Sequence, residues 1–211
     1  MTCLKDELKN WTDELDNFKA SEWDSLPDIY LYMDQVITWL ERQLDISPTL
    51  EDEKMITPSM INNYVKNRVI PKPEKKKYGR EHLTYLMLVL SLKQVLSLTD
   101  ITWLISNVIR DTSVDILYDK LNDMKTESFK QVSSRVLDQL KDMDDKSGEE
   151  EVEKSLSNLA LKLALEANAY RHAARKILNT LMERRVEEQE NKAESEGSKK
   201  KEGSRKKNKS K

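Results

Sequence analysis

Residues 56–83, ITPSMINNYVKNRVIPKPEKKKYGREHL, decide the fold and the function that we predict for this chain. Thr57 is a suitable N-cap, and Pro58 suits the first helical position, where its missing N–H costs nothing. A short helix is therefore predicted from Pro58 to about Asn67. The two prolines in residues 69–73 exclude a helix there, because proline lacks a backbone donor and disfavours α geometry at the preceding residue.

The predicted short helix has two different faces. One side carries apolar residues that can pack on a core: Met60, Ile61, Tyr64 and Val65. The opposite side carries polar residues: Ser59, Asn62, Asn63, Lys66 and Asn67. Asparagine does not stabilise helices, but its amide can pair bidentately with an adenine edge in a DNA major groove. The polar side is therefore a candidate base-reading surface, although a short polar helix is also often only a solvated face.

A basic loop follows this helix. Residues 54–93 hold 9 basic and 2 acidic side chains, whereas residues 1–53 hold 4 and 14. Such cations could follow a phosphate backbone, which would leave sequence reading to the helix. The loop has no Asn-Gly pair, so a tight two-residue hairpin is not predicted in it. The candidate DNA-binding residues are Ser59, Asn62, Asn63, Lys66, Arg68, Lys72, Lys75, Lys76, Lys77 and Arg80.

Hydrophobic periodicity predicts further helices along the chain. They are expected near residues 3–20, 29–44, 80–96, 98–108, 113–124 and 127–143, and a long helix with a heptad-like stripe is expected over residues 149–190. Ser147 and Glu150 have the spacing of a capping box for the last helix. The rich Lys, Ser, Glu and Gly content of residues 191–211 predicts a disordered basic tail.

The opening stretch resembles the winged helix-turn-helix of MerR-type regulators. Ile61-Asn62-Asn63-Tyr64 would occupy the recognition helix, Ile70-Pro71 its exit, and residues 72–77 a basic wing. The chain is also similar to a bacterial family known as domain of unknown function 1836, through LYMDQV at residues 31–36 and MINNYVK at residues 60–66. That similarity covers roughly residues 20–112. The resemblance implies a MerR-like fold and a transcriptional regulator.

Catalysis and metal binding have no support in the sequence. His82, His172 and Cys3 show no metal-ligand spacing, and His82 is expected at the surface. No phosphate-binding glycine loop or nucleophile motif is present, so neither an enzyme nor a cofactor is predicted. Aromatic residues on apolar helical faces are expected in the core: Tyr32, Trp39, Tyr85 and Trp103. The single cysteine, and the lack of a signal peptide or transmembrane run, predict a cytoplasmic protein without a membrane partner.

We therefore expect an all-α, homodimeric protein that binds double-stranded DNA, with an unknown effector. The expected domains are a MerR-like DNA-binding domain with an N-terminal helical arm at 1–112, a helical region at 113–190 with dimerisation as its candidate role, and the tail at 191–211. A helical adaptor that binds a protein through residues 149–190 is the alternative from another class. RNA binding is a weaker alternative, because no aromatic stacking platform accompanies the basic residues.

Overall fold

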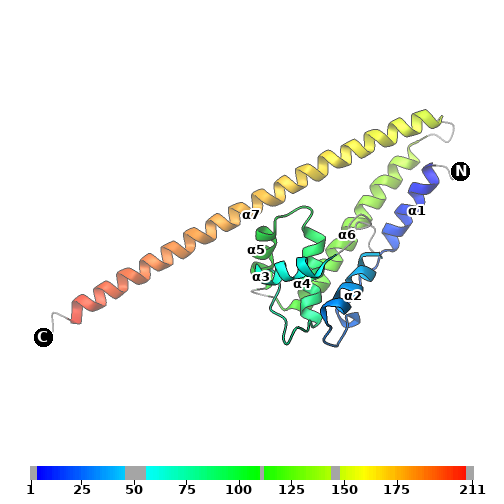
Figure 1. The fold of residues 1–211 in the computed structure, drawn as a ribbon. Coiled ribbons are helices and arrows are strands. Elements are labelled where there is room, and N and C mark those ends of the chain that lie inside the picture. Colours follow the sequence, from blue (N-terminus) through cyan, green and yellow to red (C-terminus); the bar gives the residue numbers. More distant parts are fainter. Residues whose placement is uncertain (1–3, 46–55, 110–111, 144–147, 208–211) are drawn as a thin grey trace. The chain divides into compact units, whose positions relative to one another are not determined.

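Helices make up nearly all regular structure in the part of the chain that is described. The structure is a computed structural model, and it describes residues 4–45, 56–109, 112–143 and 148–207. These ranges contain α1 (Leu4–Asn17), the 3-10 helix η1 (Trp23–Ser25), α2 (Met33–Asp45), α3 (Pro58–Lys66), α4 (Arg80–Leu92), α5 (Leu98–Ile109), α6 (Val114–Lys141) and α7 (Glu149–Lys207) (Figure 1). The predicted all-α class is confirmed.

The chain divides into two units. The first is Met1–Lys162 and the second is Leu163–Lys211, so the division falls within α7. The domain boundary predicted between residues 112 and 113 lies inside the first unit. Ser147, the predicted cap of the last helix, lies outside the described residues.

The core of the first unit is built around α4. Most residues of α4 are buried, and Leu83, Leu86 and Val89 have no exposed surface. This helix contacts α2, α5 and α6, while α1 lies along α6 (Figure 1). A smaller contact joins the segment after α1 to α6, where the ring of Phe18 meets the edge of Phe129 at a centroid distance of 5.0 Å. The sequence of α4 is apolar on most sides of the helix. Such a helix is expected at the centre of a fold, where other helices cover it on all sides.

The helix predicted over residues 29–44 begins later than expected. α2 starts at Met33, and Leu31 instead forms an antiparallel backbone pair with Tyr78, with both N–H···O distances at 2.8 Å. A residue whose backbone groups bond to a distant segment cannot also make helical hydrogen bonds. The predicted core position of Tyr32 is therefore wrong, since 51% of its surface is exposed, and Ile29 in the same predicted helix is 66% exposed.

Two other helix boundaries differ from the prediction. The helices expected at 113–124 and 127–143 are one continuous helix, α6, because no Pro or Gly interrupts that stretch. The last helix does not end near residue 190 but continues to Lys207. The composition of residues 191–207 predicts disorder, yet their Lys, Glu and Ala residues are good helix formers, and no proline follows Pro73. Residues 208–211 lie outside the described residues.

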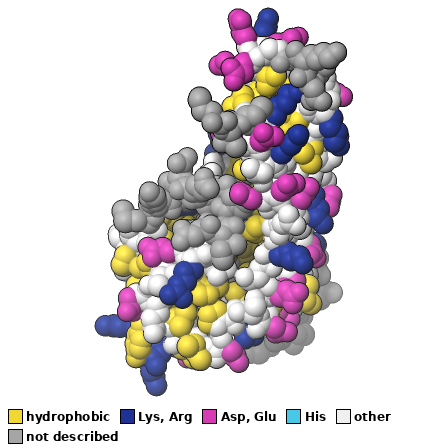
Figure 2. All heavy atoms as spheres, turned by 90° about the vertical axis from the view of Figure 1, so that its right-hand side faces the viewer, with side chains coloured by type: hydrophobic (Ala, Val, Ile, Leu, Met, Phe, Trp, Pro, Cys, Tyr) yellow, Lys and Arg dark blue, Asp and Glu magenta, His cyan; other side chains and the backbone are white. Residues whose placement is uncertain are grey.

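Large apolar side chains are exposed mainly before α2 and along α7. In the face drawn in Figure 2, hydrophobic side chains gather in the lower part of the view and recur near its top, and acidic and basic side chains are interspersed around them. Across the described residues, no helix is both long enough and apolar enough to cross a bilayer.

The two faces of α3 predict different effects on stability. Ile61→Ala removes a fully buried side chain and should lower the free energy of unfolding by about 2–5 kcal/mol. Asn62→Ala, at the next and exposed position, should change it by less than about 0.5 kcal/mol. Urea unfolding of both variants tests this contrast, and equal losses would contradict the orientation of α3.

Candidate nucleic-acid interface

The start of α3 is fixed by local hydrogen bonding, as the sequence predicts. The Thr57 Oγ1 accepts a hydrogen bond from the backbone N–H of Met60 at 3.3 Å, and Pro58 occupies the first turn. Ile61 and Tyr64 are buried, with 0% and 4% of their surfaces exposed. This anchoring sets the rotation of the helix about its axis and thereby the residues that face solvent.

The polar face of α3 points outward. Ser59, Asn62, Asn63 and Lys66 are all exposed, so the predicted orientation of this face is confirmed. The side-chain amide of Asn67 donates to the Asn63 Oδ1 at 2.8 Å and to the Asn63 carbonyl at 2.9 Å. Within the described residues, Asn62 makes no such bond. Asn62 therefore presents both its amide donor and its acceptor to solvent, whereas the acceptor of Asn63 already has one partner.

The end of α3 is a Schellman motif with arginine at the left-handed position. The Val69 N–H donates to the Tyr64 carbonyl at 2.9 Å, and the Arg68 N–H donates to the Val65 carbonyl at 3.0 Å. Arg68 has a φ of 58°, at the position where glycine is usual. The motif turns the chain sharply and leaves the Arg68 side chain exposed beside the helix end.

The basic loop contains a tight hairpin that the sequence does not predict. The Lys77 N–H donates to the Glu74 carbonyl at 2.8 Å, and Lys75 and Lys76 between them have φ values of 49° and 64°. Two positive φ values are what a type I′ hairpin turn requires, and they normally select Asn-Gly. Because that pair is absent, sequence rules give no sign of the turn. The hairpin is held by the pairing of Tyr78 with Leu31.

Left-handed backbone and positive charge coincide in this segment. Among the described residues, the non-glycine residues with positive φ are Arg68, Lys75 and Lys76, and all three are cations. A side chain in this conformation costs about 1–2 kcal/mol relative to right-handed geometry, and glycine would avoid that cost. Retention of charged side chains at strained positions is typical of functional surfaces.

Most of the predicted phosphate-binding cations lie on the surface. Lys66, Arg68, Lys72, Lys75 and Lys76 are exposed, and none of them forms an ion pair with a carboxylate of the described residues. The amino group of the partly buried Lys77 lies 5.0 Å from the ring centroid of Tyr32. We refer to the side chains from Lys66 to Lys77 as the basic segment.

Arg80 is placed differently from the other candidates. Its guanidinium lies 3.5 Å from a carboxylate oxygen of Asp28 and 3.8 Å from one of Asp24, and it lies over the Trp23 ring at 5.6 Å. Only 21% of its side chain is exposed. The structure thus uses Arg80 to join the start of α4 to η1, and the basic segment does not include it.

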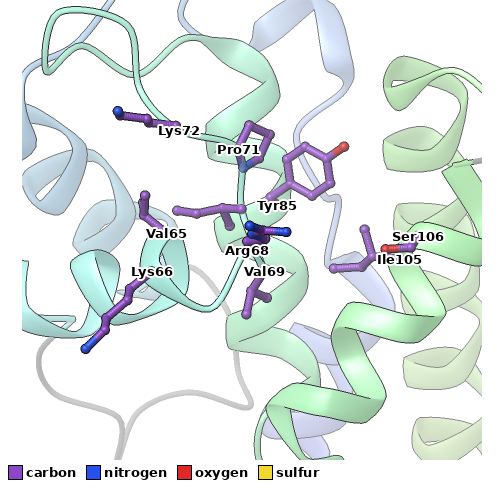
Figure 3. A pocket seen from close by; sticks show the side chains of 10 residues that line it. Val65, Lys66, Arg68, Val69, Pro71, Lys72, Tyr85, Ile105 and Ser106 are labelled. Carbon is purple, nitrogen blue, oxygen red and sulfur yellow. The ribbon is translucent and has the colours of Figure 1, made fainter.

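A hollow of about 470 Å³ lies beside Arg68. Its lining includes Arg68 and Ile70 after α3, Tyr85 of α4 and Ile105 of α5. Figure 3 shows Lys66 and Lys72 pointing outward on either side of Arg68. Burial and the nearby Glu81 carboxylate, 3.4 Å from the Tyr85 hydroxyl, raise the pKa of Tyr85 to about 12. Tyr85 therefore stays neutral and acts as packing beneath the cations.

His82 is buried, and its predicted surface position is wrong. Only 8% of its surface is exposed, and its Nδ1 accepts a hydrogen bond from the Gly79 N–H at 3.1 Å, which caps α4. Its ring meets the edge of Tyr78 at 5.5 Å. Burial lowers the pKa of His82, and this outweighs the opposite effects of the Lys72 carbonyl, Glu81 and Glu74. Among the described residues, no group of three potential metal ligands includes it.

Comparison with known protein families finds a similarity in the central part of the chain. Residues 21–124, from before η1 to within α6, are similar to the family model described as "Domain of unknown function (DUF1836)". The predicted similarity to this family is confirmed. The chain matches no curated protein and no solved structure.

The capping role of His82 predicts a pH-dependent stability. Its Nδ1 must be unprotonated to accept the Gly79 N–H, and its folded-state pKa lies below the usual value. Its contribution should therefore be complete above about pH 6.5 and be lost as the pH falls through the folded-state pKa. His82→Gln keeps an acceptor at the N3 position but does not titrate. Urea unfolding at pH 7.5 and pH 5 should show a smaller loss for His82→Gln than for the unaltered chain, and equal losses would contradict this role.

Proposed function

We propose that this protein binds double-stranded DNA in a sequence-specific manner and regulates transcription. The observation that carries the proposal is the juxtaposition of the exposed amide face of α3 with the exposed basic segment that follows it. An α-helix fits the major groove, where carboxamides can read base edges, while lysine and arginine side chains neutralise the adjacent phosphates. These two functions are the usual division of labour at a protein–DNA interface.

The arrangement of elements supports a MerR-like winged helix-turn-helix. α2 contacts both α3 and α4, as the first helix of such a motif would. The hairpin at Lys75 and Lys76 has the place and charge of a short wing, and Tyr78 pairs it with Leu31 just before α2. The recognition helix would be α3, and Ile70-Pro71 would form its exit.

Asn62 is the best placed residue for base reading. Its amide makes no hydrogen bond to the described residues, whereas Asn63 already accepts one from Asn67. A bidentate contact to adenine needs both the donor and the acceptor of one amide. Asn63 and Lys66 would then contact neighbouring bases or the backbone, and Ser59 would contact the backbone near the helix start.

We further propose that the protein acts as a homodimer. Helix-turn-helix proteins commonly bind two half-sites through a two-fold axis. The predicted heptad-like stripe of α7 is buried at Val152 and Leu159 but exposed at Tyr170, Ile177 and Leu181. The exposed part of this stripe offers apolar area for a second copy of the helix.

The same exposed side chains favour a second candidate function, a helical adaptor. On this view the residues of α7 up to 190 bind another protein and the basic segment is only a solvated surface. The exposed apolar residues of α7 would form the binding face: Leu161, Leu165, Tyr170, Ile177, Leu181 and Val186. The adaptor function requires that removal of charge from the basic segment leaves the physiological complex intact.

Replacing the two turn lysines, Lys75 and Lys76, tests the role of their charge in DNA binding without destabilising the fold. Lys75→Asn combined with Lys76→Gly gives the turn the residues that prefer positive φ, so the folded state should be as stable as the original or more stable. DNA affinity should fall, and the slope of log affinity against log salt should become shallower by about 0.9 for each phosphate that is no longer neutralised. Fluorescence anisotropy with a labelled duplex at several salt concentrations measures both.

A matched control removes two lysines elsewhere. Lys120→Gln with Lys130→Gln removes two exposed charges from α6, outside the basic segment, and should leave affinity nearly unchanged. If both double variants weaken binding equally, only net charge matters. If the unaltered chain shows no salt dependence, the protein does not bind DNA through phosphates and the adaptor function is favoured.

Substitution of single asparagines tests sequence reading. With a selected operator, Asn62→Ala should reduce discrimination at one base pair by about 1–3 kcal/mol, and Asn63→Ala should have a smaller effect. Competition binding against a set of single-base-pair variants measures the discrimination. Identical preferences in the unaltered chain and the Asn62→Ala variant would rule out base reading by this amide.

A further inference from the structure

The hollow beside Arg68 reaches beyond the basic segment to α5. Its apolar lining includes the buried side chains of Ile70, after α3, and Ile105, in α5. Ser106 of α5 also lines it, and Figure 3 shows the Ser106 hydroxyl pointing toward the side of the hollow on which Arg68 lies. Its volume of about 470 Å³ falls in the range of sites that hold small organic ligands, about 300–1,000 Å³.

The charged side chains that line this hollow are all cationic. Among the described residues they are Lys66, Arg68 and Lys72, and no described carboxylate lines the hollow with them. Tyr85 adds no negative charge, because its pKa of about 12 keeps the hydroxyl protonated at neutral pH. Positive charge beside an apolar wall raises the local concentration of small anions. The lining therefore favours an anionic ligand over a neutral or cationic one.

The backbone holds Arg68 beside the hollow. The hydrogen bonds of the Schellman motif fix this residue at a φ of 58°. Its guanidinium forms no ion pair with a carboxylate of the described residues. An arginine fork can donate two parallel hydrogen bonds to the oxygens of one anion, and the Ser106 hydroxyl can donate a third. A site whose backbone is already ordered loses little entropy when it binds a ligand.

We propose that the hollow beside Arg68 binds a small organic phosphate, with the phosphate group on the Arg68 guanidinium and the Ser106 hydroxyl and the apolar body of the ligand against Ile70 and Ile105. A phosphate monoester has nearly two negative charges at neutral pH and three acceptor oxygens. It therefore suits a lining of three cations and a hydroxyl better than a carboxylate does.

The bound ligand should also regulate the basic segment. Arg68 belongs to that segment, so an organic phosphate on its guanidinium should compete with a DNA phosphate for the same group. This competition rests on the proposed function, whereas binding of the ligand does not.

Calorimetric titration of the full chain with phenyl phosphate at pH 7.5 tests the site. Inorganic phosphate has a similar charge without the ring, and benzoate has the ring with a single charge. Phenyl phosphate should bind at one site and about tenfold or more tightly than either of the other two, since each of them lacks one of the two kinds of contact.

Two variants separate ligand binding from DNA binding. Ser106→Ala removes a hydroxyl from an exposed helical position, so the fold should be preserved. It should weaken phenyl phosphate binding about fivefold or more and leave DNA affinity unchanged. The double variant Lys75→Asn with Lys76→Gly should do the reverse, because neither lysine lines the hollow.

Arg68→Gly removes the guanidinium from both sites. Glycine suits the left-handed backbone at this position, so the folded state should be at least as stable as the original. The variant should bind phenyl phosphate about tenfold or more weakly and should also lose DNA affinity. Fluorescence anisotropy with a labelled duplex at constant ionic strength should show that saturating phenyl phosphate lowers the DNA affinity of the unaltered chain.

Each result bears on a separate part of the proposal. The site is refuted if phenyl phosphate does not bind, if inorganic phosphate binds equally well, or if Arg68→Gly or Ser106→Ala binds it as the unaltered chain does. Tighter binding of benzoate would refute the choice of a phosphate. Unchanged DNA affinity at saturating phenyl phosphate would refute the competition. A chain that binds phenyl phosphate but no DNA would refute the proposed function and support this site.

Discussion

The burial of α4 is the constraint on which the rest of the first unit depends. Its apolar side chains are covered by α2, α5 and α6, so a shift of this helix would disturb each of those contacts. The hairpin leads directly into its first turn, and an apolar hollow shared with α6 lies against its other side. The start of α4 is held in turn by Arg80, His82 and Gly79. A Cβ at Gly79 would meet the Tyr30 ring at 3.1 Å, so this close approach favours glycine.

The basic segment shows a conflict between backbone preference and charge. Glycine or asparagine would suit the left-handed positions at Arg68, Lys75 and Lys76 better than long side chains do. The surrounding structure holds these conformations through the Schellman hydrogen bonds and through the Leu31–Tyr78 pair. A protein that needed only to turn its chain there would be more stable with smaller residues. The conflict is understandable if the cations have a partner outside the protein.

Charged residues are unevenly distributed along the chain, and the basic segment differs in sign from the N-terminal residues. The chain has a net charge of −2, yet residues 54–93 hold 9 basic and 2 acidic side chains, whereas residues 1–53 hold 4 and 14. A polyanion would therefore be attracted to the basic segment more strongly than to the acidic N-terminal residues. Arg80 follows the basic segment in the chain, and its guanidinium is paired with the carboxylates of Asp24 and Asp28. The paired arginine thus marks the edge of the basic segment.

The features that could be predicted from the sequence depend on interactions between residues close together in the chain. The cap at Thr57, the outward amides of α3 and the all-helical class follow from interactions within one or two helical turns, and the sequence alone determined them. The burial of His82, the pairing of Arg80, the late start of α2 and the Lys-Lys hairpin were decided only in the tertiary structure. In each of these, residues far apart in the chain compete with local preference: Tyr78 takes the backbone bonds of Leu31, and Trp23 and Asp28 bind Arg80. Sequence periodicity does not predict such contacts, because they form only when folding brings those segments together.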